Sequence, residues 1–380
     1  MNPNIILLGI VSFLTDVSSE MIAPLMPLFL ASLGGGGLII GLVGGLGDSV
    51  ASVLKAFSGY FSDKYGRRKR FVFAGYGISA AAKLFFSFAT SAWHILALRP
   101  IERAGKGIRT APRDAIIADS VGMEERGKGF GLHRAMDNFG AVLGSVIALF
   151  LVVTYAFTYQ AVFLVAGLVA FAALIPIIWV SERRAGPKKT SLRKGFGSLS
   201  PELKVFILVS STFALANFTY MFYLLKAQEM FGAALGAAVP VALYILFNAV
   251  ETVFSYPMGS LSDRMGRKKV LLMGYGLFAL MSLGFALASS LVSIITLFIA
   301  YGVMLSMVDA TERALVSDLA QAEYRATALG AYHTSVGIAA LPGGIIAGLL
   351  WDGFGSGATF LYGAVIGAFA FLMLLMRKAR

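Results

Sequence analysis

The chain has 380 residues, of which 58% are hydrophobic and only 14% are Asp, Glu, Lys or Arg, and its mean hydropathy is +0.79. About 25% of the residues in an ordinary globular domain are charged, so this composition excludes a water-soluble fold. A membrane-spanning helix takes roughly 20 residues, and twelve of them would leave about 100–140 residues for loops and tails, too few for a soluble catalytic domain. We therefore expect a polytopic membrane protein that is not an enzyme.

The formal net charge of +12 has a topological explanation. Twenty-two of the 32 Lys and Arg residues lie in alternate loops, and the intervening set of loops contains none. This is the asymmetry of the positive-inside rule, and it accounts for the basic balance without a nucleic-acid partner. We expect a multi-pass protein of the plasma membrane with both termini in the cytoplasm. The absence of cysteine excludes disulfides and thiolate chemistry.

Twelve apolar segments are long enough to span a membrane, and lipid admits only helices for such segments. The predicted spans are residues 4–31, 37–61, 70–89, 92–119, 129–154, 160–181, 203–229, 237–261, 270–288, 291–318, 326–350 and 357–376. A basic stretch at 182–202 is predicted to be a cytoplasmic linker between an N-terminal six-helix half at 1–181 and a C-terminal half at 203–380.

The first segment carries two carboxylates within an apolar stretch. Asp16 and Glu20 are four residues apart and share one helix face with Ser12, Thr15 and Ser19. Neighbouring carboxylates in a membrane can take up and release protons, so this pair is a candidate for proton coupling. A nearby arginine would oppose protonation, and the charge state of the pair stays open at this point.

The loop after the second segment recurs in the second half. Residues 59–69 read GYFSDKYGRRK and residues 259–269 read GSLSDRMGRKK, while farther along the repeat interval is 199 residues. Six predicted helices separate the copies, so the two halves run parallel and are related by an axis along the membrane normal. Two facing halves with a cavity between them are the layout of a transporter.

This repeated loop resembles the most specific signature of the major facilitator superfamily. The resemblance implies an all-α membrane fold with 12 transmembrane helices in two pseudo-symmetric six-helix bundles. It also implies a conformational latch formed by Gly59, Asp63, Gly66, Arg67, Gly259, Asp263, Gly266 and Arg267. The alternative is that the basic loop only anchors the chain at the anionic lipid surface. In segment 129–154, Gly140-x-x-x-Gly144-Ser145 is similar to the antiporter-associated Gly-x-x-x-Gly-Pro, with Ser145 in place of the proline.

Segment 92–119 carries a charged stripe that cannot face lipid, because an arginine at membrane depth costs about 3 kcal/mol or more. Its members recur every three or four residues and are Arg99, Glu102, Arg103, Lys106, Arg109 and Arg113. Arg99 occupies the place of the family's intramembrane arginine, whereas Glu102 and Arg103 stand where the family usually has Gln and Gly. Two interpretations of Arg99 and Arg103 remain open: pairing with Glu102, Asp16 or Asp137, or contact with a substrate.

Other intramembrane polar residues complete the candidate substrate and proton site. In the first half they are Arg134 and Asp137, for which an ion pair between packed helices is the alternative interpretation. In the second half they are Asn217, Glu251, Asp309 and His333, and a packing role is at least as plausible for the histidine. No metal site and no cofactor are expected, since three His and no Cys supply a transition-metal site poorly.

These features predict a secondary active transporter, a functional monomer in membrane lipid that works by rocker-switch alternating access. The expected activity is proton-coupled efflux, as by an antiporter, of a small organic solute, either anionic or amphipathic. The chain contains no nucleotide-binding motif, so the drive is an ion gradient or the substrate's own gradient, and the proton gradient is the expected driving force. The alternatives are a solute importer (symporter or uniporter) on the same fold, or a metal-cation exporter that uses Asp16, Glu20 and His333.

Overall fold

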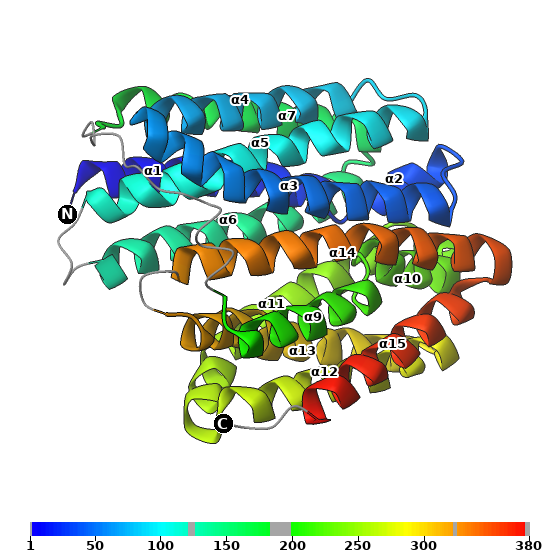
Figure 1. Cartoon of the computed structure of the whole chain (residues 1–380). Coiled ribbons are helices and arrows are strands. Elements are labelled where there is room, and N and C mark those ends of the chain that lie inside the picture. The colour runs from blue at the N-terminus through cyan, green and yellow to red at the C-terminus, as the bar shows by residue number, and fades with distance from the viewer. Residues whose placement is uncertain (1, 121–125, 183–198, 322–324, 377–380) are drawn as a thin grey trace. The chain divides into compact units, whose positions relative to one another are not determined.

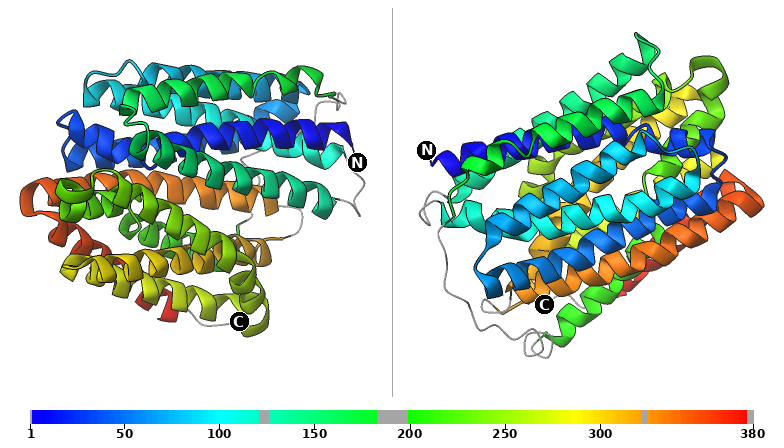
Figure 2. Two further views of the ribbon diagram at one scale, coloured as in Figure 1. Left: turned by 180° about the vertical axis from the view of Figure 1, so that it is seen from behind. Right: turned by 90° about the horizontal axis from the view of Figure 1, so that it is seen from above.

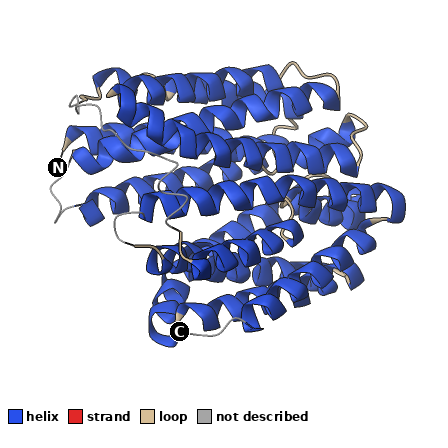
Figure 3. Cartoon of the chain, in the orientation of Figure 1, coloured by secondary structure: helices blue, strands red, loops and turns tan. Residues whose placement is uncertain are grey.

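A computed structural model describes residues 2–120, 126–182, 199–321 and 325–376 of the chain, and within these ranges every regular element is a helix (Figure 3). The chain divides into two compact units. Unit 1 comprises residues 1–34 and 50–190, and unit 2 comprises residues 35–49 and 191–380. Most of the predicted linker, residues 183–198, lies outside the described residues.

The helices before the linker are labelled in Figure 1. They are α1 (Pro3–Ile22), α2 (Met26–Ser32), α3 (Gly37–Tyr65), α4 (Arg68–Phe86), α5 (Ala92–Asp119), α6 (Arg126–Val153), α7 (Tyr159–Ala172) and the 3-10 helix η2 (Pro176–Trp179). Those after it are α9 (Pro201–Ala216), α10 (Met221–Leu235), α11 (Ala238–Met265), α12 (Arg267–Leu287), α13 (Leu291–Leu319), α14 (Arg325–Phe354) and α15 (Ser356–Met376). Helix α3 is shared, because its residues 37–49 group with unit 2.

The all-helical membrane fold is confirmed. In the described part of the chain, ten helical segments are long and apolar enough to cross a membrane. Helices α4 and α5 are the two predicted spans outside this set, and their charges explain why. Helix α5 alone carries five basic and three acidic residues, and α4 begins with Arg68, Lys69 and Arg70.

Three predicted spans are not continuous α-helices. Segment 4–31 is interrupted between α1 and α2, where Pro24 in the connection and Pro27 in the first turn of α2 each lack a backbone N–H. Segment 160–181 leaves the α-helical form after α7 and ends in η2, which starts at Pro176. Segment 203–229 breaks between α9 and α10, where Asn217 adopts φ −83° and ψ 64°. Each half of the sequence therefore starts with an interrupted helix.

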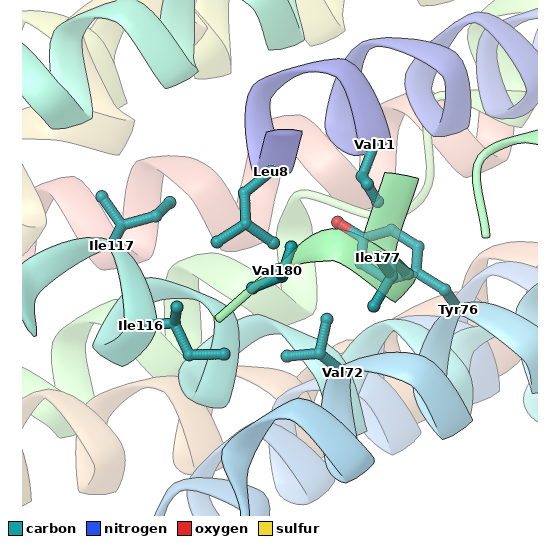
Figure 4. Close-up of a cluster of buried hydrophobic side chains, with 8 residues drawn as sticks. All are labelled: Leu8, Val11, Val72, Tyr76, Ile116, Ile117, Ile177 and Val180. Carbon is teal, nitrogen blue, oxygen red and sulfur yellow. The ribbon is translucent and has the colours of Figure 1, made fainter. Parts of the chain in front are cut away.

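Unit 1 is built around two helix pairs. Helix α1 packs along α6 and α7, and α4 packs along α5 and α7; the two views in Figure 2 show these helices side by side. At one end, apolar side chains of α1, α4, α5 and η2 converge on a buried cluster (Figure 4), formed by Leu8, Val11, Val72, Tyr76, Ile116, Ile117, Ile177 and Val180. This cluster holds together the helices that carry the buried charges.

Unit 2 has an aromatic core. Helix α12 packs on α13 and α15, α11 packs on α13, and α9 packs on α14 and α15. The rings of Phe213 and Tyr275 stack with their centroids 4.0 Å apart, and Tyr223 stacks on Tyr301 at 4.6 Å. Many large apolar side chains of both units, such as Phe88 in unit 1 and Leu280 and Phe369 in unit 2, are exposed, as expected for a surface that contacts lipid.

Glycines allow residues 37–49 of α3 to contact α14 within unit 2. A Cβ at Gly41 would lie 2.0 Å from the carbonyl oxygen of Gly344, and a Cβ at Gly344 would lie 2.4 Å from the carbonyl oxygen of Gly41. The contact is extended by Asp352, whose carboxylate accepts hydrogen bonds from the backbone N–H groups of Gly37 at 2.6 Å and Leu38 at 2.9 Å. Such direct backbone contact is the usual role of small residues between membrane helices.

Candidate functional site

Helix α5 places a three-residue ionic group inside unit 1. Arg99 and Glu102 are buried, with 5% and 2% of their surface exposed. Arg99 Nη1 donates to Glu102 Oε2 at 3.0 Å, and Arg103 Nε lies 3.6 Å from the same oxygen. One carboxylate therefore faces two guanidinium groups. Of the partners that the sequence left open for Arg99 and Arg103, the structure places Glu102 against both.

Close packing of α4 on α5 completes this group. A Cβ at Gly75 would lie 2.7 Å from the carbonyl oxygen of Gly105, and a Cβ at Gly105 would lie 2.5 Å from that of Gly75. Because the two backbones approach so closely, Ser79 Oγ donates to Glu102 Oε1 at 3.2 Å. About two turns after Glu102 on α5, the guanidinium carbon of Arg109 lies 4.3 Å from the centre of the Tyr76 ring, a cation–π contact.

Lys83 on α4 is a buried cation that the sequence analysis did not single out. Only 1% of its surface is exposed, and its Nζ donates to Ser19 Oγ at 2.7 Å, Ser18 Oγ at 3.2 Å and the Thr15 carbonyl oxygen at 3.3 Å. The polar face of α1 therefore serves as the solvation shell of an ammonium group. The available signal was that Lys83 is the one charged residue in the apolar stretch 71–89.

The predicted carboxylate pair of α1 lies in the same unit. Asp16 and Glu20 are both half-buried, and the charged groups that act on Asp16 are Asp137, Lys106, Glu20 and Arg109. Two carboxylates and two cations thus surround Asp16. The structure brings together the acidic residues of α1, the stripe of α5 and the acid of α6, and the proton-binding role stays a prediction.

The two residues predicted on helix α6 have different surroundings. Arg134 is exposed, whereas the neighbouring His133 is buried with 4% of its surface exposed. Asp137, the other predicted member, is half-buried and lies near Ser12. Arg113 Nη1 donates to that serine at 3.0 Å. The charged stripe of α5 therefore reaches α6 through Arg113 and Asp137, and the side chain of Arg134 points elsewhere.

Some of the buried cationic donors have no acceptor within the described part of the chain. Arg99 Nε and Arg109 Nη1 are both fully buried and without a hydrogen-bond partner there. An unsatisfied buried donor costs roughly 1–3 kcal/mol, and more when it is charged. A group with negative charge or strong acceptor atoms would satisfy these donors, so the arrangement is suited to binding an anion.

The second-half candidates do not form a comparable group. Asn217 ends α9, where its backbone N–H donates to Phe213 O at 2.8 Å. Asp309 is exposed and lies 3.9 Å from Arg313 Nη2. Glu251 and His333 are half-buried, and the His333 ring lies 5.0 Å from Tyr332. Among the described residues of unit 2, the acid that is buried is Glu312, which was not among the predicted site residues.

The repeated loop makes an equivalent ion pair in each half of the sequence. Arg267 Nε lies 3.3 Å from Asp318 Oδ2 and its Nη1 lies 2.5 Å from Asp263 Oδ1. In the first half Arg68 pairs with Asp119. Arg267 follows Arg68 by 199 residues, and Asp318 follows Asp119 by the same interval. Gly266 follows Gly66 by 200 residues, so the paired arginine comes directly after the glycine in the second half and two residues after it in the first.

The remaining latch residues have differing surroundings. Arg67 is exposed, and the side chain of Asp63 lies outside the described residues. Gly66 and Gly266 have φ values of +61° and +93°, which favour glycine at the turn. A Cβ at Gly59 would lie 3.2 Å from Ala111 Cβ, whereas one at Gly259 would have no atom within 4 Å. The latch role stays a prediction.

Comparisons with known proteins agree with this architecture. The chain matches the family model described as Major Facilitator Superfamily over residues 8–251 and 241–380. It is 44% identical over 379 residues to an uncharacterized MFS-type transporter of Methanocaldococcus jannaschii, covering 99% of this chain and 95% of the relative. It is 23% identical over 350 residues to the multidrug resistance protein MdtH of Aeromonas hydrophila, covering 91% and 87%. A crystal structure of the nucleoside transporter NupG has a TM-score of 0.82 at 17% identity, covering 100% of each chain, which shows a shared fold.

Proposed function

The chain belongs to the Major Facilitator Superfamily and is a multi-pass membrane transporter, not an enzyme; from this premise we propose that it exports a small organic anion, or an amphipath with an anionic group, in exchange for protons. We further propose that it acts as a monomer in the plasma membrane by alternating access, with both termini in the cytoplasm. The proton gradient is the proposed driving force, and no cofactor is required.

The observation that carries the substrate class is the excess of buried positive charge in unit 1. Glu102 faces both Arg99 and Arg103, so this group retains one positive charge. Lys83 is held by neutral oxygen atoms alone among its hydrogen-bond acceptors. Cations at membrane depth are costly unless a partner compensates them, and a bound anion would offset that cost.

Two of the cations have the geometry of ligand-binding groups. Arg99 Nε and Arg109 Nη1 have no acceptor in the described part of the chain, although the two side chains have only 5% and 4% of their surface exposed. Arginine binds carboxylates, phosphates and sulfonates through paired N–H groups. The Tyr76 ring beneath Arg109 holds the guanidinium in place by a cation–π contact.

Proton coupling is proposed for Asp16, with Glu20 and Asp137 as neighbouring acids. Lys106 and Arg109 act on the same carboxyl, so a bound anion that neutralises one of these cations would change how readily Asp16 takes up a proton. Binding of the anion and of the proton are then linked. The likeness to a multidrug resistance protein supports export as the direction.

The metal-cation alternative gains no structural support. Within the described ranges, no group of three His, Cys, Asp or Glu side chains is placed to hold a metal ion. The importer alternative concerns direction only, and the same flux experiment tests it.

The test uses purified full-length protein in proteoliposomes, with a labelled organic carboxylate and a pH gradient of either sign. We expect saturable flux of the labelled carboxylate in the direction opposite to the proton flow. Other carboxylates and sulfonates should compete with it, and organic cations should not. Arg109→Gln should abolish competition by anions, whereas the matched control Arg134→Gln, which removes an exposed cation of α6, should retain it. Competition by organic cations with no effect of anions would refute the anionic substrate. Flux that does not respond to the pH gradient would refute proton coupling.

A further inference from the structure

Unit 2 contains a buried carboxyl that the proposed transport mechanism does not use. Glu312 lies on α13 with 5% of its surface exposed. The hydroxyl of Tyr275 on α12 donates to its Oε1, and the hydroxyl of Tyr332 on α14 donates to its Oε2. Ser210 on α9 borders the same carboxyl. Four helices thus converge on one acidic group, which we call the Glu312 cage.

The Glu312 cage is acidic and holds no counter-cation. In the parts of unit 2 that the structure describes, no Lys, Arg or His forms an ion pair with Glu312. The adjacent Arg313 turns away, because its Nε donates to the Asp309 carbonyl oxygen at 2.8 Å and its Nη2 lies 3.9 Å from the Asp309 carboxylate. Asp309, a second acid, acts on Glu312.

The titratable groups on the helices packed against α13 do not supply that cation. Helix α12 presents Tyr275, α14 presents Tyr332 with His333 beside its ring, and α9 presents the neutral Ser210. On α11, Glu251 acts on Tyr301. A single carboxyl surrounded by hydroxyl groups has two ways to avoid a buried net charge: it binds a cation or it binds a proton.

The equivalent place in the first half shows the opposite charge. Subtracting the repeat interval of 199 residues converts Glu312 to Arg113, and Arg313 to Asp114. In unit 1 that arginine is paired, since its Nη2 lies 2.9 Å from Asp114 Oδ1. In unit 2 the corresponding neighbours are not paired with each other. The ion pair that compensates the charge in one half is therefore missing from the other.

We propose that the Glu312 carboxyl is a proton-binding site that exchanges one proton with water at the Arg- and Lys-rich end of unit 2. Glu312 is seven residues before the end of α13 at Leu319, about 10 Å along the helix at 1.5 Å per residue, so the path to water is short. The proton adds to a lone pair of one carboxylate oxygen, and both tyrosines keep their own protons. Proton binding at Glu312 does not depend on the proposed transport function, and only a role of this proton in transport would rest on it.

A proton fits the Glu312 cage better than a metal cation does. Hard cations such as Ca²⁺ take six to eight oxygen ligands, whereas this group offers one carboxyl, two phenol hydroxyls and one serine. Both carboxylate oxygens already accept hydrogen bonds, which a coordinated cation would displace. The structure therefore favours protonation in place over exchange for an ion.

The experiment is pH-difference infrared spectroscopy of the full-length protein in lipid nanodiscs without any solute, from about pH 5 to about pH 9, which spans the range of perturbed carboxyl groups. We expect a C=O stretching band of a protonated carboxylic acid that disappears as the pH rises. Glu312→Gln should remove this band, and Asp309→Asn, one turn earlier on α13, should retain it. Tyr332→Phe should retain the band but shift it to higher frequency, because the carbonyl loses one hydrogen-bond donor.

Three outcomes would overturn the proposal: a set of pH-dependent carboxyl bands that is the same in Glu312→Gln as in the wild type, a wild-type spectrum without a pH-dependent carboxyl band, or a Glu312 band whose titration moves when Na⁺ replaces K⁺. The Tyr332→Phe shift tests the assignment even where the Glu312 variant does not fold, and an unshifted band would also contradict it. Because no solute is present, the result is independent of the anion-export test.

Discussion

Substitution of Gly75 by alanine is expected to disrupt the cationic group of unit 1, whereas the same substitution two residues later is not. A Cβ at Gly75 would lie 2.7 Å from Arg109 Cβ and from the Gly105 carbonyl oxygen, and 2.9 Å from the Arg109 backbone nitrogen. A Cβ at Gly77 would have no atom within 4 Å outside its own turn of helix. Both glycines are inside α4, so the pair differs in packing alone.

The expected magnitude follows from these contacts. Non-bonded carbon atoms prefer separations of about 3.5–4.0 Å, so α4 and α5 would have to separate by several tenths of an ångström or more. Overpacking of this kind typically costs about 1–3 kcal/mol. Alanine also has a helix propensity about 1 kcal/mol better than glycine, but both variants gain this equally. The difference in unfolding free energy between the variants is therefore expected to be about 1–3 kcal/mol, with Gly75→Ala the less stable.

Function should follow the same order. Separation of the two helices would lengthen the hydrogen bond from Ser79 to Glu102 and lift Arg109 from the Tyr76 ring, so Gly75→Ala should lose affinity for the anion. Denaturant unfolding in mixed micelles and binding of a labelled carboxylate to the same preparations measure both effects. Equal stability and equal affinity of the two variants would refute the claim that the close approach of α4 and α5 positions the cationic group.

Three further predictions concern the charged residues of unit 1. Glu102→Gln removes the one carboxylate between two guanidinium groups and should lower the unfolding free energy by about 3–5 kcal/mol. Arg103→Ala should lower it clearly less, because Arg99 keeps its partner. Equal losses of unfolding free energy in chemical denaturation would contradict the shared pairing. Lys83→Met removes the donor to the oxygen atoms of Thr15, Ser18 and Ser19 and should lower the unfolding free energy by about 1–3 kcal/mol; anion flux of the folded protein should fall at least about tenfold, the effect of 1.4 kcal/mol, and unchanged flux would exclude Lys83 from the site. Asp16→Asn and Glu20→Gln should each abolish flux that is driven by a pH gradient, while solute exchange without a gradient continues. Gradient-driven flux that survives in both variants would show that α1 has no coupling role.

Much of the architecture could be predicted because membrane helices are encoded locally. The bounds of α5 agree with the predicted segment 92–119, and the charged stripe on it was readable from spacing alone. The interruptions at the starts of the two halves were not predicted, although Pro24 and Pro27 were available as signals. Apolar content identifies a span whether or not its helix is continuous, so hydropathy alone does not locate a break.

The surroundings of two buried charges, Lys83 and Glu312, were not predicted from the sequence, because they depend on contacts between distant segments. Lys83 is tolerated because α1 provides oxygen atoms for it, and Glu312 because two tyrosines come from helices before and after its own. A charge in an apolar stretch indicates that some partner exists, but it does not identify the partner. The sequence analysis named Arg67 as the equivalent of Arg267, whereas the structure shows that Arg68 makes the equivalent ion pair. The repeat interval changes from 200 to 199 residues inside the loop, and only the ion pairs with Asp119 and Asp318 show at which residue it changes.

The contact between Gly41 and Gly344 has a consequence for the evolution of this chain. At each position the obstacle to a side chain is the carbonyl oxygen of the other glycine, and a carbonyl group is common to all amino acids. A harmful enlargement at one position therefore has no compensating reduction at the other, because neither residue can become smaller. Suppressors of Gly41→Ala selected for growth or flux should therefore arise at other positions, where a substitution increases the distance between α3 and α14. No substitution at Gly344 should rescue Gly41→Ala, and none at Gly41 should rescue Gly344→Ala.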